Sequence, residues 1–465
     1  MDTLQEALDR FLTEELSMSK LGTQIFAQAF EKRGIKLRPK QIRELQAKLR
    51  GPIVDLSSVR FNLSSRQMSA LTENERTRGS INLDLEVEEM SARLEKELPA
   101  LVPILVQSIS ESLYRDLRRK MPSILGEVRR ERQGFERRMA EKWEPAIKLL
   151  DFLREMAVEA GVDCIRSIRA NAEDHPPHVL EVVTRLHARS CQIVSEIIVL
   201  LRTGHADGAH ARWRSLHEIA VTAFFIRSHG DDVAERYLLH EGVESFKAAS
   251  QYTRYYDELG VEPLGDAEWA DLKGRYESVL LRYGNAYGEK YGWASAALNN
   301  RNPSFAEIER AAGLSYLGPY YKWASYNVHA TPKGVFVKLG LLPEEKILLA
   351  GPSNLGLTDP AQLAALSLTQ ITTTLLTIVP NIDRLVMCEV LRKFGGGIGE
   401  AFFKVQQEIE RSGRKQLARR RKKEQARKSP PLKTPRSAGE EAQELREERE
   451  GKRTKRRSRA KLPRG

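Results

Sequence analysis

The sequence has little cysteine and no long, uninterrupted apolar run. Its three cysteines, Cys164, Cys191 and Cys388, form no Cys-x-x-Cys pair, so a disulfide framework and a zinc cluster are both disfavoured. The most apolar stretch, residues 363–379, contains a serine, a glutamine and five threonines, which is typical of a buried helix and not of a membrane span. The first 16 residues are acidic and amphipathic, unlike a signal peptide. We therefore expect a cytoplasmic protein with no membrane span.

The motifs that identify common cofactors and nucleophiles are missing as well. The three glycines at 395–397 lack the lysine of a phosphate-binding loop, and no Gly-x-Ser-x-Gly sequence occurs. His175 and His178 lie three residues apart in a proline-containing loop, but no third metal ligand is near them in the sequence. The sequence therefore predicts no cofactor and no metal site.

Positive charge is concentrated at the C-terminus. Residues 404–465 carry 23 Lys and Arg against 9 Asp and Glu. The totals are 75 and 63, so residues 1–403 carry 52 and 54 and are nearly neutral. The net charge of +12 is therefore a property of the C-terminal segment and not of the body of the protein.

Apolar periodicity predicts a mainly α-helical protein in three parts. Residues 1–87 contain helical spacing over 4–16, 23–32 and 39–49, followed by alternating apolar residues at 59–63 and 81–87. This alternation predicts a short β-hairpin within residues 53–87, or else a loose linker. Residues 88–400 have the pattern of a multi-helix bundle, with helix restarts or interruptions at Pro122 and Pro380. Residues 401–465 form the third part, a basic tail with few apolar residues that we expect to be disordered.

The segment from Gly204 to Arg227 contains the densest group of ionisable residues on a predicted buried helix. Arg214 and Glu218 are four residues apart and can form an ion pair, and His210 and His217 lie on or beside the same face. Charged groups beside Trp213 are costly to bury unless they have partners. The group is therefore either a structural ion pair between helices or a functional polar site.

His329 lies near the end of a later predicted helix, which Pro332 and Gly334 terminate. Three segments resemble those of a known protein family: GFERR at 134–138, followed by Trp143; RSLHE at 214–218; and ASYNVH at 324–329. Together they resemble a family of uncharacterised bacterial proteins, known only as a domain of unknown function. The resemblance covers roughly residues 90–390. It implies that Arg214, Glu218 and His329 occupy positions that the family also uses, and we predict that these three side chains meet in one polar site.

Two kinds of hydrolytic chemistry could use ionisable residues of this type. Helical ribonucleases use an Arg-x(4–6)-His motif, and the chain contains two such spacings, Arg212–His217 and Arg169–His175, which is no more than chance predicts. A metal hydrolase could draw on His210, His217, Glu218 and His329, but no His-Glu-x-x-His motif supports it.

The basic tail is either a solubilising extension or a contact for nucleic acid. Its candidate nucleic-acid-binding residues form two clusters: Arg419, Arg420, Arg421, Lys422 and Lys423, and Arg453, Lys455, Arg456 and Arg457. Phosphate contacts of this kind are independent of base sequence and are weakened by salt. No aromatic residues interleave with the charges, so stacking on single strands is not indicated.

The sequence favours a binding or interaction module that a basic tail holds near nucleic acid. The alternative is a hydrolase, most plausibly a nuclease of a toxin or defence system, with Arg214, Glu218 and His329 as catalytic residues. Substrate, protein partners and oligomeric state do not follow from the sequence.

Overall fold

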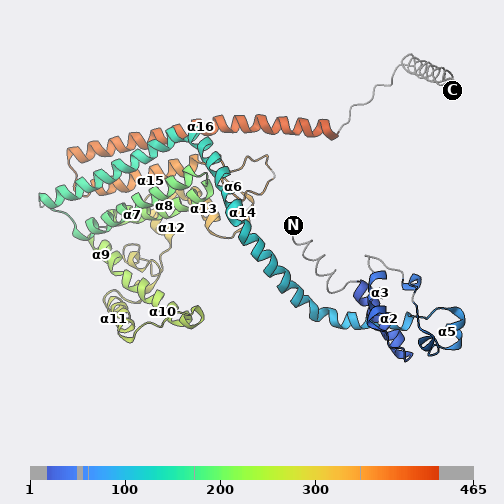
Figure 1. Cartoon of the computed structure of the whole chain (residues 1–465). Helices are drawn as coiled ribbons and strands as arrows, with labels where there is room; N and C mark the ends of the chain where they lie inside the picture. Colours follow the sequence, from blue (N-terminus) through green and yellow to red (C-terminus); the bar gives the residue numbers. More distant parts are fainter. Residues whose placement is uncertain (1–17, 50–55, 61, 172, 346, 429–465) are drawn as a thin grey trace, which may run out of the picture. The chain divides into compact units, whose positions relative to one another are not determined.

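Every regular element that the structure describes is a helix, which confirms the predicted mainly α fold (Figure 1). The computed structural model describes residues 18–49, 56–60, 62–171, 173–345 and 347–428. The chain divides into two compact units, Met1–Gln133 and Gly134–Gly465. The boundary predicted at residues 87 and 88 lies near the start of helix α6 (Asp84–Ala170), whereas the two units divide within that helix.

The first unit is built on a pair of helices, α2 (Met18–Lys32) and α3 (Pro39–Lys48). Gly34 has a positive φ of 72° in the turn between them, and Pro39 is the first residue of α3, where its missing N–H costs nothing. The helices share a small apolar core made of Phe26, Phe30, Ile35, Leu45, Leu49 and Leu71.

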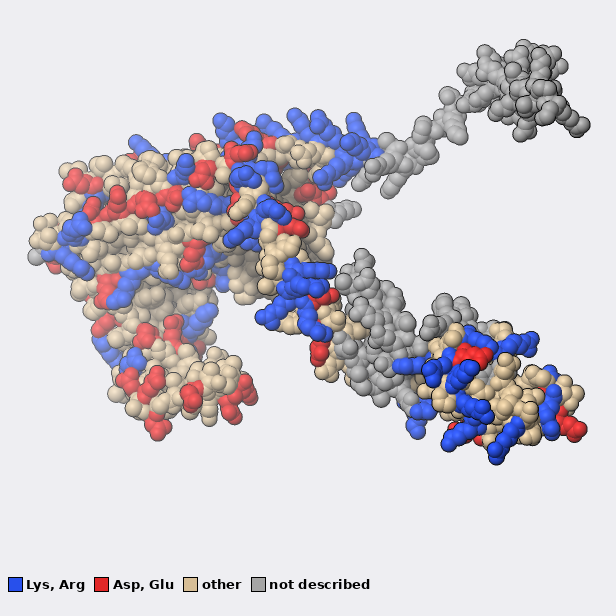
Figure 2. Space-filling model, viewed as in Figure 1, with Lys and Arg blue, Asp and Glu red and all other residues tan. Residues whose placement is uncertain are grey.

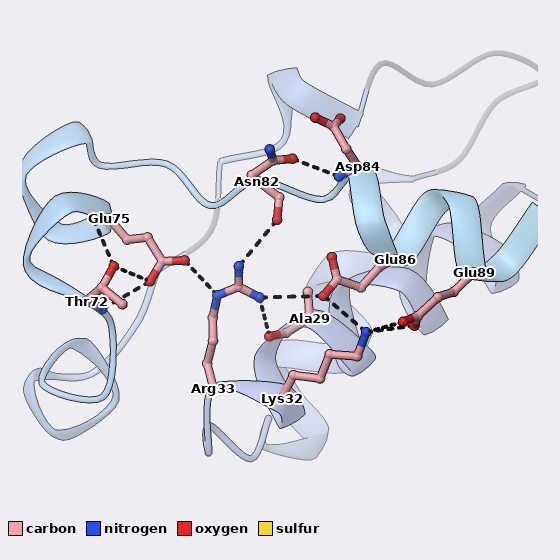
Figure 3. Close-up of polar contacts among 9 residues, drawn as sticks. All are labelled: Ala29, Lys32, Arg33, Thr72, Glu75, Asn82, Asp84, Glu86 and Glu89. Carbon is pink, nitrogen blue, oxygen red and sulfur yellow. Dashed lines mark hydrogen bonds and ion pairs between the residues drawn. The ribbon is translucent and has the colours of Figure 1, made fainter.

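A network of ion pairs supports this core (Figure 3). Arg33 donates to the Glu75 carboxylate at 2.7 Å, and this bond holds the pKa of Glu75 below its usual value. Glu86, only 3% exposed, lies 3.7 Å from both Arg33 and Lys32. Lys32 also pairs with Glu89 at 2.7 Å. Since the buried Glu86 has two cationic neighbours, its charge is compensated inside the unit.

The predicted β-hairpin is wrong. The described residues between 56 and 87 contain a 3-10 turn, η1 (Leu56–Ser58), two short helices, α4 (Ser65–Met68) and α5 (Glu73–Arg78), and the start of α6, but no strand. Both short helices begin with capping boxes, in which Ser64 pairs with Gln67 and Thr72 with Glu75. These Ser/Thr-x-x-Gln/Glu spacings favour helix starts over strands. Residues 53–55 and 61 lie outside the described residues.

Helix α6 is continuous over 87 residues, so the predicted restart at Pro122 is wrong. A proline removes one backbone hydrogen bond, yet Pro122 and Pro145 both lie inside α6. Charged or apolar residues with high helix propensity surround both prolines, and within the second unit Trp143 and Ile147 anchor the helix in the core.

The second unit is a bundle around one large apolar core. Helices α7 (Pro177–Arg202) and α8 (Ala206–His229) form a hairpin, and α15 (Thr358–Leu376) packs against both. The hairpin turns at Gly204, whose φ is 78° and whose carbonyl accepts from the Ser353 N–H at 2.9 Å. A side chain at Gly204 would meet the Ser353 carbonyl oxygen at 2.6 Å, so the close approach requires glycine.

The remaining helices of this unit lie between α8 and α15 in the chain. They are α9 (Asp231–Leu239), α10 (Glu241–Leu259), α11 (Asp266–Tyr283), α12 (Phe305–Ala311), α13 (Gly318–Val328) and α14 (Pro332–Phe336). Of these, α12 and α13 pack against α8 and complete its polar surroundings.

The last helix, α16 (Ile382–Lys428), extends past the boundary predicted at residue 401. Its first half packs on α15 and buries Leu391, Ile398 and Phe402. The helix then continues through the first basic cluster, so the predicted tail is helical as far as Lys428. The second cluster, with Arg453, Lys455, Arg456 and Arg457, lies outside the described residues.

Candidate functional site

A polar cluster lies where α8 meets α12 and α13. His210, Arg214, His217 and Glu218 follow one another along α8 at intervals of four, three and one residues, so they share one side of the helix. Helix α13 runs antiparallel to α8, because Tyr321 contacts His217 whereas Trp323 contacts the earlier His210.

Arg214 and Glu218 meet, as expected, and Tyr321 joins them. Their side chains are 3.2 Å apart. The Tyr321 hydroxyl accepts from Arg214 Nη2 at 2.9 Å and donates to Glu218 Oε1 at 2.6 Å, and the guanidinium lies 4.9 Å from the centre of the tyrosine ring. Burial and the neighbouring Glu218 carboxylate both raise the pKa of Tyr321. The hydroxyl therefore remains protonated and links the two charges.

His217 is fully buried, and its Nε2 lies 2.7 Å from Glu309 Oε1 on α12. Burial lowers the pKa of His217, although Glu309 acts in the opposite direction. Because a carboxylate only accepts hydrogen bonds, Nε2 of the neutral ring carries the proton. The other nitrogen, Nδ1, is then an acceptor, and it has no partner among the described residues.

His210 is also fully buried, one turn before Arg214. Trp213 stacks on its ring at 5.6 Å and contacts the ring of His217 at 5.3 Å. Burial lowers the pKa of His210 to about 4, so the ring is neutral at pH 7. Neither of its nitrogens has a hydrogen-bond partner in the described part of the chain, and the same holds for Nε of Arg214. The cluster thus contains buried polar atoms that could bond a small polar group or water.

His329 does not belong to the polar cluster of α8, α12 and α13. It caps the end of α13, where its backbone N–H donates to the Ser325 carbonyl at 3.0 Å, and its side chain is exposed. It follows Tyr321 by eight residues, roughly 12 Å along a helix. Across the described residues, no hydrogen bond or ion pair joins His329 to Arg214 or Glu218. The structure brings two of the three predicted residues together, and the catalytic role of the three stays a prediction.

Two residues of the cluster were not anticipated, Glu309 and Tyr321. Glu309 lies 92 residues from its partner His217, and Tyr321 lies 107 residues from Arg214. Tyr321 is one of several aromatic residues in its segment, and no local spacing distinguishes it. Among the residues that the structure describes, no three His, Cys, Asp or Glu side chains come together as metal ligands.

The first basic cluster of the candidate nucleic-acid-binding residues lies on the exposed second half of α16 (Figure 2). Arg419, Arg420, Arg421, Lys422 and Lys423 are all exposed, and none forms an ion pair with a side chain that the structure describes. Arg421 makes a long hydrogen bond of 3.5 Å to the Glu344 carbonyl.

The described part of the protein is therefore all-α, with a buried polar network on α8 and an exposed basic helix at the end of α16. In sequence, residues 180–346 match a family of unknown function (DUF5677), which confirms the expected resemblance to an uncharacterised family. The matched region contains the RSLHE and SYNVH segments, whereas Gly134 to Trp143 precede it. No curated protein and no solved structure matches the chain. In the described part of the chain, every helix is too short or too polar to cross a membrane.

Proposed function

We propose that this protein binds nucleic acid through residues 411–428 of α16, here named the α16 basic segment. The segment carries ten Lys and Arg but only one acidic residue, Glu424. The observation that carries the proposal is the run from Arg419 to Lys423, in which five consecutive exposed cations have no ion-pair partner in the described chain.

The helical form of the run supports this proposal. Successive residues of an α-helix are about 100° apart, so five consecutive cations surround the helix on all sides. No face of that turn is left to pack against an apolar core, and the charges remain available to an anionic partner. A polymer with regularly spaced phosphates suits such a run, because each phosphate contact releases a bound counterion.

Other arginines of the second unit have a different environment. Arg384 pairs with Glu173 at 2.8 Å, Arg202 with Asp151 at 2.9 Å, and Arg212 with Glu196. Their charges are compensated by the protein, whereas Arg419 to Lys423 form no ion pair with a side chain that the structure describes.

The segment contains no aromatic residue, so binding would rest on phosphate contacts and not on base stacking. We expect little preference for base sequence. The nuclease hypothesis is less well supported, because His329 lies on the surface and shares no contact with Arg214 and Glu218. We further infer a cytoplasmic location, which agrees with three cysteines that form no disulfide.

The test is the affinity of the full chain for a fluorescently labelled DNA duplex and for an RNA strand of equal length, measured by anisotropy over a range of KCl concentrations. In the test variant, Arg419, Arg420, Arg421, Lys422 and Lys423 are replaced by Gln. We expect affinity for duplex DNA to fall by at least about tenfold, and the salt dependence to weaken by about four to five counterions.

The matched control replaces five exposed arginines of α6 by Gln and changes the net charge equally: Arg129, Arg130, Arg132, Arg137 and Arg138. If both variants lose the same affinity, net charge and not the α16 basic segment is responsible. Absence of binding by the unmodified chain at low salt would overturn the proposal, and metal-independent or metal-dependent cleavage of either probe would revive the nuclease hypothesis.

A further inference from the structure

A large groove lies on the second unit between the C-terminal part of α6, α7 and α15. Its volume is about 830 Å³, within the range of small-molecule sites. The walls are mainly apolar, with Val158, Val162 and Ile165 on α6 and Leu375 on α15. Val162 is 49% exposed, so apolar surface in this groove is open to solvent.

Small residues line part of the groove. Gly161 on α6 lies over the His187 ring of α7, and a methyl group at Gly161 would be 2.5 Å from that ring. Ala188, the next residue of α7, is exposed and also lines the groove. Larger side chains at these positions would fill the space, as they do elsewhere between packed helices.

The floor of the groove is uncharged at neutral pH. His187 Nε2 lies 3.2 Å from the Thr372 hydroxyl and 3.8 Å from Cys191 Sγ. Burial lowers the pKa of His187 to about 4 and raises the pKa of Cys191 to about 11. An imidazole and a thiol in these neutral states can be covered by an apolar chain without burying a charge.

One end of the groove is cationic. Its lining includes Arg166 and Arg169, which are exposed and three residues apart on α6, and includes no acidic residue. Arg166 has Asp163 at 3.2 Å, whereas Arg169 has no ion-pair partner within the described residues. An apolar surface that ends at two arginines is complementary to a molecule with an apolar chain and an anionic head.

We propose that this groove binds a single-chain amphiphile with an anionic head group. The chain lies along Val158, Val162 and Ile165, above the His187 floor, and the head group pairs with Arg169 and Arg166. This site is separate from the α16 basic segment, and the proposal does not depend on nucleic-acid binding.

The test uses dodecanoate, which displaces a fluorescent fatty-acid analogue from the full chain. Ala188→Phe fills the groove at an exposed position and is expected to weaken binding at least about tenfold. Arg169→Gln removes a head-group partner and is expected to weaken binding by about three- to tenfold. Dodecanol, which has the same chain and no charge, should compete at least about threefold less well than dodecanoate.

Matched controls are Ala140→Phe, at an exposed alanine of α6 outside the groove, and Arg185→Gln, at an exposed arginine of α7 that does not line it. Both should bind dodecanoate like the unmodified chain, and circular dichroism confirms that each variant is folded. Unchanged affinity in folded Ala188→Phe overturns the location. Equal competition by dodecanol overturns the head-group assignment, and non-saturable binding overturns the site altogether.

Discussion

The polar cluster of α8 and the basic segment of α16 use charge in opposite ways. In the α8 cluster, Arg214, Glu218 and Tyr321 contact one another within 3.2 Å, and His217 bonds to Glu309. In the α16 basic segment, five consecutive cations remain exposed and form no ion pair in the described chain. A buried polar group without a partner lowers stability, whereas an exposed charge without a partner costs little.

This difference separates two effects of mutation. Changes in the α8 cluster should alter the free energy of unfolding, because its side chains are buried or half-buried and all except His210 are bonded to protein partners. Changes in the α16 basic segment should alter binding and leave stability nearly unchanged. The following predictions test this separation, from the largest expected effect on stability to the smallest.

The largest effect concerns the buried His210 and His187, whose pKa values are both lowered to about 4 by burial. In the unfolded chain a histidine titrates near 6.5. As pH falls below 6.5, protons bind the unfolded chain first, so the free energy of unfolding decreases down to about pH 4. Each histidine should contribute about 2 to 3 kcal/mol to this loss. Denaturant unfolding at pH values above and below this window measures it.

The contribution of His210 is isolated by His210→Phe, which cannot bind a proton. This variant should lose about 2 to 3 kcal/mol less stability than the unmodified chain over the same pH interval. The exposed His205, replaced by Gln, serves as the control. An identical pH dependence in His210→Phe would show that His210 is not buried in the neutral form.

The next effect concerns the bond between His217 and Glu309. Glu309→Ala leaves His217 Nε2 buried without an acceptor, and we expect a loss of about 2 kcal/mol in the free energy of unfolding, measured with urea. Glu309→Gln retains an acceptor at the same place and should lose less. Equal losses in both variants would indicate that charge, and not the hydrogen bond, stabilises the pair.

A smaller effect is expected for Tyr321→Phe, which removes the hydroxyl between Arg214 and Glu218 and leaves their direct 3.2 Å contact in place. We expect a loss of about 1 kcal/mol in urea unfolding. The Tyr320 hydroxyl forms no hydrogen bond within the described residues, so Tyr320→Phe serves as the control. A double-mutant cycle with Glu218→Gln should show coupling, and additive losses would contradict the bridging role.

The smallest effect is expected for the replacement of Arg419 to Lys423 by Gln. Since these side chains are exposed and have no ion-pair partners in the described chain, the free energy of unfolding should change by no more than about 0.5 kcal/mol. Thermal unfolding followed by circular dichroism measures it. A loss above about 1 kcal/mol would remove the contrast between the two regions.

The sequence predicted local features better than distant contacts. The four-residue spacing of Arg214 and Glu218 correctly indicated an ion pair. Tyr321 and Glu309 reach the cluster only because the chain returns to α8 about 100 residues later, and no periodicity encodes that return.

The wrong predictions have local causes. Leu83 and Val87 alternate with polar residues, but they are also four residues apart, and such spacing fits the start of a helix as well as a strand. Pro122 suggests a helix break, because proline removes one backbone hydrogen bond. The long helical segments on both sides of Pro122 stabilise the helix by more than this one lost bond.

Helix α16 has one further consequence. Its first half is fixed in the core by Leu391, Ile398 and Phe402, and the same helix continues into the cations. A flexible basic chain must give up conformational freedom when it binds a polyanion, and this loss reduces its affinity. A basic segment that is already helical has met that entropic penalty during folding, so each of its phosphate contacts can contribute more fully to affinity.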